Sequence, residues 1–385
     1  MPPETLIVDL SDTALRDADR LKWGASDADV LSAWVAEMDF ELAPAVTAAL
    51  SDAVSRGVTG YPTFDRLSGV PEAACGFAER RWGWKLDSDS VVLVGDVMAG
   101  VALALRTLCD DAAVVVPTPA YPPFLDVASQ AGRAMVTVPL SADDQVATLD
   151  VDAIGSALRA GAGTVLLCNP HNPWGRAFTR PELEALCDVV HLHGARVISD
   201  EVHAPLVLPG STHVPYASLE GAAGHTTTLL AASKAWNLPG LKCAQIIAGS
   251  PADARALRAL PLIANHGTSP LGLVASRAAY GAGEHWLDAL VARLTANRAL
   301  FRGLMAELVP GARLRPMEAT YLAWVDARSY GLENPAGTAL ERGRVLVNDG
   351  RAFGPGGQGH VRVNLATSPQ RIEQIVERLA RAWEG

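Results

Sequence analysis

The chain has 385 residues, of which 49% are hydrophobic and 19% charged, and its formal net charge at pH 7 is −10. This length allows two domains with a sizeable core, and the composition excludes an intrinsically disordered chain. The negative charge and the lack of a basic cluster argue against a nucleic-acid-binding face, and no apolar run reaches the roughly 20 residues of a membrane span.

The first residues and the cysteines point to a reducing compartment. Residues 1–20 are rich in Asp and lack the basic start and the apolar stretch of a secretory signal, so we expect a cytoplasmic protein. The five cysteines show neither paired nor metal-ligand spacing. We therefore expect reduced thiols and no metal site.

Strand-like apolar runs alternate with helical patterns through the first two thirds of the chain. A near-continuous apolar run is typical of a strand that is buried on both faces, and its alternation with helices favours a mostly parallel sheet. One covering helix is predicted over residues 181–193, with Thr179 as its N-cap and Gly194 at its end. The seven predicted strands are 91–94, 113–116, 135–138, 164–168, 195–199, 227–230 and 245–248.

The pattern changes after about residue 265. Apolar residues at helical spacing predict long helices over 284–308 and 369–383, with short strands between them near 321–325 and 360–364. We expect a smaller α+β domain, formed by residues 266–385 and joined by the N-terminal arm, residues 1–45. Residues 46–265 then form the large domain. The Gly-rich stretch 354–359 is predicted to be a loop, because it lies far from any strand-to-helix turn suited to a dinucleotide.

Three segments place polar residues directly after predicted strands, where open α/β sheets bind ligands. Residues 168–176 read Cys-Asn-Pro-His-Asn-Pro-Trp-Gly-Arg, and residues 198–203 read Ile-Ser-Asp-Glu-Val-His. Lys234 follows the strand at 227–230 among small and apolar residues, which solvate a cation badly and favour an amine that can form an imine. Lys234 is therefore a candidate Schiff-base lysine, and the candidate aldehyde is pyridoxal 5′-phosphate (PLP).

The order Asn-Pro-x-Asn-Pro-x-Gly, then Asp200, then Lys234 resembles that of the fold-type-I PLP enzymes of the class I/II aminotransferase superfamily. The resemblance runs from about Trp34 to the C-terminus. It implies an α/β fold with a large PLP-binding domain, built on a mostly parallel seven-stranded sheet, and a smaller α+β domain. It also implies bound PLP, an amino-acid substrate and a homodimer with shared active sites.

The resemblance assigns roles to the residues of these motifs. Lys234 would hold the aldehyde and later take the proton from the substrate Cα, and Asp200 would keep the ring nitrogen of PLP protonated. Asn172 would donate to the ring O3′ oxygen and lie beside the substrate. A capping aspartate and a turn asparagine are the alternatives for these two residues. His203 stands where related aminotransferases usually carry Tyr, and the sequence leaves open whether it contacts the cofactor.

Three further residues match family positions. Tyr121, within Pro-Thr-Pro-Ala-Tyr-Pro-Pro-Phe, matches the aromatic residue that stacks on the pyridine ring, with core packing as the alternative. Tyr61, within Gly-Tyr-Pro, matches the tyrosine that reaches the phosphate of the neighbouring subunit's PLP. Arg362, within His-Val-Arg-Val-Asn, matches the arginine that holds the substrate α-carboxylate, with a surface arginine as the alternative. The predicted catalytic residues are Lys234, Tyr61 and Tyr121.

The phosphate of PLP is expected at the start of the helix that follows strand 91–94. Backbone N–H groups at a helix N-terminus favour an anion, which predicts binding near Val97 and Met98. Asp96 departs from the family pattern, because relatives mostly carry an uncharged residue there. A carboxylate beside a phosphate is unfavourable, so we expect Asp96 to cap the helix or to point away.

The other phosphate contacts also depart from the family pattern. Lys242 stands where many relatives place a phosphate-binding arginine, and it would act as a point charge without the fork of a guanidinium group. Ala231 replaces a serine that contacts the phosphate in many relatives. Ser233 is a candidate phosphate contact, and the sequence leaves open whether it compensates for that missing donor.

The site residues serve both transamination and β-elimination, so only family detail discriminates between them. Residues 34–40 read Trp-Val-Ala-Glu-Met-Asp-Phe and resemble the Trp-Val-Ala-Asp-Met-Asp-Phe signature of the cystathionine β-lyase (C–S lyase) branch, with Glu37 in place of Asp. We therefore expect a PLP-dependent β-lyase that cleaves L-cystathionine or a related cysteine S-conjugate to thiol, pyruvate and ammonia. The alternatives are an aminotransferase on the same fold and, from another class, a PLP-binding regulatory protein.

Overall fold

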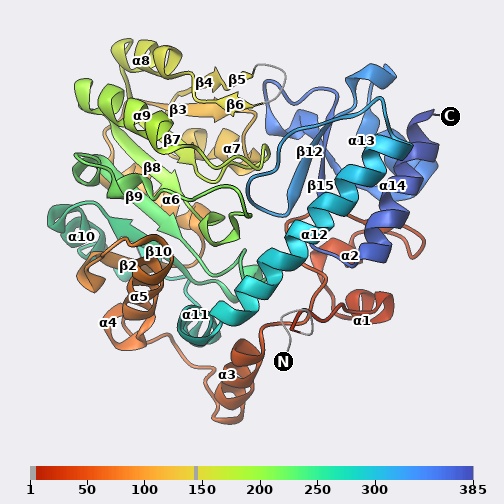
Figure 1. Ribbon diagram of the computed structural model, residues 1–385. Helices are drawn as coiled ribbons and strands as arrows, with labels where there is room; N and C mark the ends of the chain where they lie inside the picture. Colours follow the sequence, from red (N-terminus) through yellow and green to blue (C-terminus); the bar gives the residue numbers. More distant parts are fainter. Residues whose placement is uncertain (1–5, 143–145, 385) are drawn as a thin grey trace.

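A seven-stranded sheet forms the centre of the larger part of the molecule (Figure 1). The computed structural model describes residues 6–142 and 146–384. The strand order is β2-β10-β9-β8-β7-β3-β4, and all pairs are parallel except those that β10 makes with its two neighbours. The strands are β2 (Val91–Val94), β3 (Ala113–Thr118), β4 (Met135–Pro139), β7 (Ala162–Cys168), β8 (Arg196–Asp200), β9 (Thr226–Leu230) and β10 (Ala244–Ala248). All seven predicted strands are confirmed.

Helices cover both faces of this sheet, because successive residues of its central strands point to opposite sides. On β7, Val165 and Leu167 belong to the core beneath α8 and α9, whereas Leu166 and Cys168 belong to the core beneath α6 and α7. These helices are α6 (Val97–Leu108), α7 (Pro122–Gln130), α8 (Val151–Arg159) and α9 (Arg180–Leu192). The predicted helix is α9, which begins with a capping box formed by Thr179 and Glu182.

A second, antiparallel sheet lies in the smaller part of the molecule, in the order β11-β12-β15-β14. Its strands are β11 (Arg313–Leu314), β12 (Leu322–Asp326), β14 (Asn348–Asp349) and β15 (His360–Asn364). The helices beside it are α12 (Glu284–Leu308), α13 (Pro335–Gly343) and α14 (Pro369–Glu384). Figure 1 shows α12 running from the region of the large sheet to this smaller one. The predicted α+β arrangement of the C-terminal third is confirmed.

The N-terminal arm joins the C-terminal third. It contains α1 (Asp12–Asp17), α2 (Leu21–Gly24) and β1 (Leu31–Ser32), and β1 pairs in parallel with β13 (Val345–Leu346). Arm residues such as Trp23 and Phe40 share one hydrophobic core with α12, α14 and β15. The domain boundaries at residues 45 and 265 stay a prediction.

The helices that follow the arm complete the fold. They are α3 (Pro44–Ser55), α4 (Asp65–Ser68), α5 (Val70–Trp82), α10 (Pro251–Arg258) and α11 (Pro270–Ala282), and α11 packs against α3 and α5. The stretch 354–359 is a loop before β15, as predicted. The five cysteines form no disulfide. Within the described residues, no helix has the length and apolarity needed to span a membrane.

Candidate active site

A pocket of about 270 Å³ lies at the carboxyl ends of the parallel strands, between the large sheet, the N-terminal arm and β15. The loops that follow β3, β7, β8 and β9 contribute to it, as open α/β sheets favour. Ten of the eleven predicted site residues line this one pocket: Val97, Met98, Tyr121, Asn172, Asp200, His203, Ser233, Lys234, Lys242 and Arg362. Residues more than 260 positions apart in the sequence therefore converge as the family resemblance predicts.

Lys234 presents its amine to the pocket a few residues after the end of β9. Its Nζ donates to the carbonyl oxygen of Ala36 at 3.2 Å. Desolvation, with a smaller contribution from the positive charge of Arg362, lowers the pKa of Lys234 from 10.5 to about 8. The amine is therefore substantially neutral near pH 8, which is the state required of a nucleophile or of a base.

Asp200 ends β8 and is buried at the wall of the pocket. Its Oδ1 accepts from the backbone N–H of Val202 at 3.0 Å. Within the described residues, no lysine, arginine or histidine forms an ion pair with this carboxylate. Burial raises the pKa of this carboxyl from 3.8 to about 7. A buried carboxyl without a cation fits a ligand that brings a protonated ring nitrogen.

His203 lines the pocket as a neutral imidazole. Burial lowers its pKa to about 3, with smaller contributions from Lys234 and Arg362. Its Nδ1 is buried and has no hydrogen-bond partner in the part of the chain that the structure describes. Its ring lies edge-on to Tyr321, with 6.5 Å between the centroids. The position favours a ligand contact, and the role of His203 stays a prediction.

Arg362 and Asn172 form a pair at the pocket wall. One guanidinium nitrogen of Arg362 donates to Asn172 Oδ1 at 3.0 Å, and the other donates to Asn348 Oδ1 at 2.6 Å and to the Trp34 carbonyl at 3.1 Å. The guanidinium group also lies over the ring of Phe353, 5.0 Å from its centroid. Burial lowers the pKa of Arg362 to about 10, so the group stays charged at neutral pH. Its buried place excludes the alternative of a surface arginine.

The N-terminus of α6 faces the same pocket, with Val97 and Met98 among the lining residues. Asp96 is the N-cap of this helix, and its Oδ1 accepts from the Ala99 N–H at 2.8 Å. The expectation that Asp96 caps the helix is confirmed. The sequence did not reveal that Asp96 also pairs with Lys242, whose Nζ lies 2.8 Å from its Oδ2. Lys242 therefore lines the pocket with its charge partly neutralised, and its contact with a phosphate stays a prediction.

The two predicted catalytic tyrosines differ in position. Tyr121 precedes α7, lines the pocket and packs edge-on against Phe124, with 5.8 Å between the ring centroids. Tyr61 does not line the pocket of its own chain. Its side chain is 89% exposed and lies beside His266, with 6.0 Å between the centroids. The contact predicted for Tyr61, with the phosphate of the neighbouring subunit's PLP, stays a prediction.

The arm supplies contacts that the sequence did not reveal. Val35 and Ala36 line the pocket through the backbone and small side chains, for which no chemical motif exists. Asn364, two residues after Arg362, donates to the carbonyls of Val35 and Glu37, at 2.7 Å each. An asparagine two residues after the predicted substrate-binding arginine was the only available signal.

The pocket fits PLP. It combines an amine of lowered pKa, a buried carboxyl without a cation and the N-terminus of a twelve-residue helix, which suit an aldehyde, a ring nitrogen and a phosphate. Among the described residues, no group of three or more His, Cys, Asp or Glu side chains is arranged to hold a metal ion.

Comparison with known proteins identifies the family. The model of the family "Aminotransferase class I and II" matches residues 31–379. The chain belongs to this family. A relative from Mycobacterium leprae is 43% identical, with 94% of each chain covered. The cystathionine beta-lyase of Corynebacterium glutamicum is 39% identical over 95% of this chain and 97% of its own.

Solved structures agree with this assignment. Cystalysin from Treponema denticola, whose crystal structure contains PLP, matches with a TM-score of 0.92 and 25% identity, over 98% of this chain and 99% of that chain. The expected family, its fold type and its C–S lyase branch are confirmed.

Proposed function

We propose that this protein is a PLP-dependent carbon–sulfur β-lyase, which cleaves L-cystathionine or a related cysteine S-conjugate to a thiol, pyruvate and ammonia. The observation that carries the proposal is the convergence of Lys234, Asp200 and the Arg362–Asn172 pair on one pocket. The pocket belongs to a chain that is 39% identical to a cystathionine beta-lyase over nearly its whole length.

Each of these residues has a role that follows from its chemistry. PLP bound here would supply an electron sink for the charge that develops at the substrate Cα. Arg362 holds the α-carboxylate of the substrate with its planar fork, and Asn172 fixes the plane of that fork through the 3.0 Å hydrogen bond. Lys234, whose pKa of about 8 leaves a large neutral fraction, takes the Cα proton.

The remaining residues of the pocket would hold the cofactor. Asp200 would meet the ring nitrogen of PLP, the N–H groups at the start of α6 would bind the phosphate, and Ser233 and Lys242 would add phosphate contacts. His203 offers a neutral ring nitrogen, and Tyr121 offers an aromatic face. Because Asn172, Asp200, His203 and Arg362 are buried, water is restricted on their side of the pocket, which strengthens the electrostatic contacts there.

We also infer a homodimer. Two segments that expose large apolar side chains lie next to each other beside the edge strand β2. Asp65 in one segment and Asn265 in the other both hydrogen-bond the backbone of Leu93 in that strand. The exposed residues are Tyr61, Phe64, Leu67, Leu262 and Ile263, each at least 73% exposed. An apolar group of this size is typical of an interface. A cytoplasmic location is proposed as well, which the five unpaired thiols support.

The experiment that tests the function is pyruvate release from PLP-loaded protein supplied with L-cystathionine and no keto acid. Pyruvate and homocysteine in equal amounts, both absent with the Lys234→Ala variant, are the expected result. Amino-group transfer to an added keto acid, without pyruvate release in its absence, would refute the lyase and leave an aminotransferase. No reaction with either substrate combination would leave a PLP-binding protein without turnover.

The shared site is tested by mixing two inactive variants, Lys234→Ala and Tyr61→Phe, under conditions that allow subunits to exchange. If Tyr61 serves the neighbouring subunit, each mixed dimer contains one intact site, and the mixture recovers about a quarter of the unmodified activity. If Tyr61 serves its own subunit, no mixed dimer contains an intact site and no activity returns.

A further inference from the structure

The segment 34–40, near the end of the N-terminal arm, contacts both Lys234 and Arg362. The carbonyl oxygen of Ala36 accepts from Lys234 Nζ at 3.2 Å and from the Tyr321 hydroxyl at 3.0 Å. The carbonyl oxygen of Trp34 accepts from Arg362 at 3.1 Å. Among the hydrogen bonds of residues 6–142 and 146–384, the Ala36 carbonyl is the only acceptor of the Lys234 amine. The position of this backbone therefore sets the position of the amine.

This backbone has no regular secondary structure to hold it, because residues 34–40 belong to no helix or strand. Side chains hold it, together with a few backbone hydrogen bonds such as that from the Asp39 N–H to the Ala366 carbonyl at 2.9 Å. Asn364 donates to the carbonyls of Val35 and Glu37, and Asn237 both accepts from the Met38 N–H at 2.9 Å and donates to the Met38 carbonyl at 3.0 Å. Both residues next to Ala36 are thus fixed by hydrogen bonds from behind the pocket wall.

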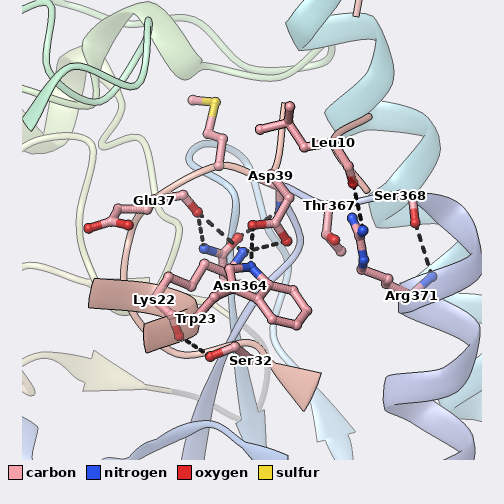
Figure 2. A network of polar contacts seen from close by, with 12 residues as sticks. Leu10, Lys22, Trp23, Ser32, Glu37, Asp39, Asn364, Thr367, Ser368 and Arg371 are labelled. Carbon is pink, nitrogen blue, oxygen red and sulfur yellow. Dashed lines mark hydrogen bonds and ion pairs between the residues drawn. The ribbon is translucent and has the colours of Figure 1, made fainter. Parts of the chain in front are cut away.

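A buried ion pair lies behind these contacts (Figure 2). Lys22 Nζ is 2.9 Å from Asp39 Oδ2, both side chains are 1% exposed, and the amine also donates to the Glu37 carbonyl at 3.4 Å. The Trp23 indole N–H donates to the other oxygen, Asp39 Oδ1, at 2.8 Å. The contact between Lys22 and Asp39 is an ionic one, since Asp39 Oδ2 lacks the alignment of a hydrogen bond. Figure 2 shows Lys22 and Trp23 beneath Asp39, with the Trp23 indole reaching its carboxylate.

Such a pair is a poor device for stability alone. Removing both charges from water costs several kcal/mol per ion, which the attraction between them repays only in part, and apolar pairs of the same volume are often as stable. Burial lowers the pKa of Lys22, which reflects that cost. A charged pair, however, fixes a single arrangement of the chain, because any other arrangement would leave one buried charge without a partner.

We propose that Lys22 and Asp39 are positioning residues, which hold segment 34–40 so that the Ala36 carbonyl keeps the free amine of Lys234 in one place. This role rests on the proposed function, in which Lys234 binds PLP and later acts as a free base. A free amine exists before PLP is attached and again after the substrate has displaced the lysine. The pair acts in both situations through the same carbonyl.

The test uses the variant Lys22→Met/Asp39→Asn, in which both charges are removed and the Trp23 N–H keeps an oxygen acceptor. Single substitutions are avoided, because each would leave one buried charge unpaired. The matched control is Arg344→Met/Asp29→Asn, which removes an exposed ion pair of 2.7 Å between Asp29 of the same arm and Arg344 at the end of α13, away from segment 34–40. Trp23→Phe is a second, milder variant, which keeps both charges and removes only the 2.8 Å hydrogen bond to Asp39.

The first measurement is the rate at which the apoprotein attaches PLP, followed by visible absorbance. We expect this rate to fall roughly 10- to 100-fold in Lys22→Met/Asp39→Asn, as loss of orientation predicts, to fall less in Trp23→Phe and to be unchanged in the control. The second measurement is the dissociation constant of PLP in a Lys234→Ala background, where the cofactor is held without a covalent bond. There we expect no change beyond about twofold, because the amine that the pair positions is absent.

Two results would overturn the proposal. An unchanged attachment rate in the double variant and in Trp23→Phe shows that the pair positions nothing. If PLP affinity in the Lys234→Ala background falls by as large a factor as the attachment rate, the pair merely supports the pocket. If the double variant does not fold, the rate with Trp23→Phe decides alone. A protein that attaches PLP but releases no pyruvate refutes the proposed lyase function, and the attachment rates still decide the role of the pair.

Discussion

The buried carboxyl of Asp200 makes a prediction about stability as well as about activity. Asp200→Asn removes a charge that the apoprotein holds without a cation, and the amide keeps an oxygen to accept from the Val202 N–H. Raising the pKa of this carboxyl from 3.8 to about 7 costs the folded apoprotein about 4 kcal/mol at a pH above both values. The amide side chain does not carry this cost.

The sign of the effect follows from proton binding. Between pH 3.8 and about 7 the folded state holds a proton on Asp200 that the unfolded state has released, so the contribution of this group to stability falls as the pH rises through that range. Relative to the unmodified apoprotein, Asp200→Asn should therefore be more stable by about 2 kcal/mol at pH 5 and by about 4 kcal/mol at pH 8. The same variant should lose 100-fold or more in kcat, roughly, because the counter-charge of the ring nitrogen is gone.

The assay is urea unfolding of both apoproteins at the two pH values, with pyruvate release measured on the PLP-loaded forms. Equal stability of the two apoproteins at pH 8, or a difference that does not change between pH 5 and pH 8, would refute the reasoning. A stabilised variant with full activity would also refute it, because the cost of burying this carboxyl would then serve no step of the reaction.

Three other predictions follow from the pocket. Arg362→Lys should raise KM roughly 10- to 100-fold with a smaller change in kcat, because an ammonium group cannot hold two oxygens; steady-state kinetics that show a change in kcat alone would contradict the role of the fork. Asp96→Asn keeps an oxygen for the cap of α6 and frees the charge of Lys242 from its ion pair. Equilibrium dialysis should therefore show that the affinity for PLP rises up to roughly fivefold. Weaker PLP binding would count against a phosphate at this helix. The rate of PLP attachment to the apoprotein should rise with pH to a plateau above about 8, since only the neutral amine of Lys234 reacts; a midpoint near the ordinary 10.5 would show that the pocket does not lower this pKa.

Much of the fold could be predicted because most strands of the large sheet are buried on both faces. A run such as Val91–Val94 or Ala244–Ala248 is apolar at every position or nearly so, and helices with capping signals separate such runs. The reversed direction of β10 could not be predicted, since a strand buried on both faces has the same pattern whichever way it runs. That direction depends on connections whose paths are set by packing.

The candidate site could be predicted where side chains carry the chemistry. Lys234, Asp200, Asn172 and Arg362 stand in motifs, and their convergence follows from the common edge at which parallel strands end. The Ala36 carbonyl could not be predicted, because any residue offers the same backbone oxygen. The Lys22–Asp39 pair was equally hidden, since two opposite charges 17 residues apart in an arm rich in Asp resemble a solvated surface until burial is known.

The most direct test of the account is to locate the cofactor on the chain. The sequence contains four lysines, and each has a different environment: Lys22 is buried in the ion pair, Lys85 is exposed, Lys242 is paired with Asp96 and Lys234 faces the pocket. Borohydride reduction of the PLP-loaded protein, followed by mass spectrometry of its peptides, identifies the lysine that is attached. The expected result is the phosphopyridoxyl mass on the peptide that carries Lys234 and on no other. Modification of Lys242 instead, or of several lysines to similar extents, would contradict it.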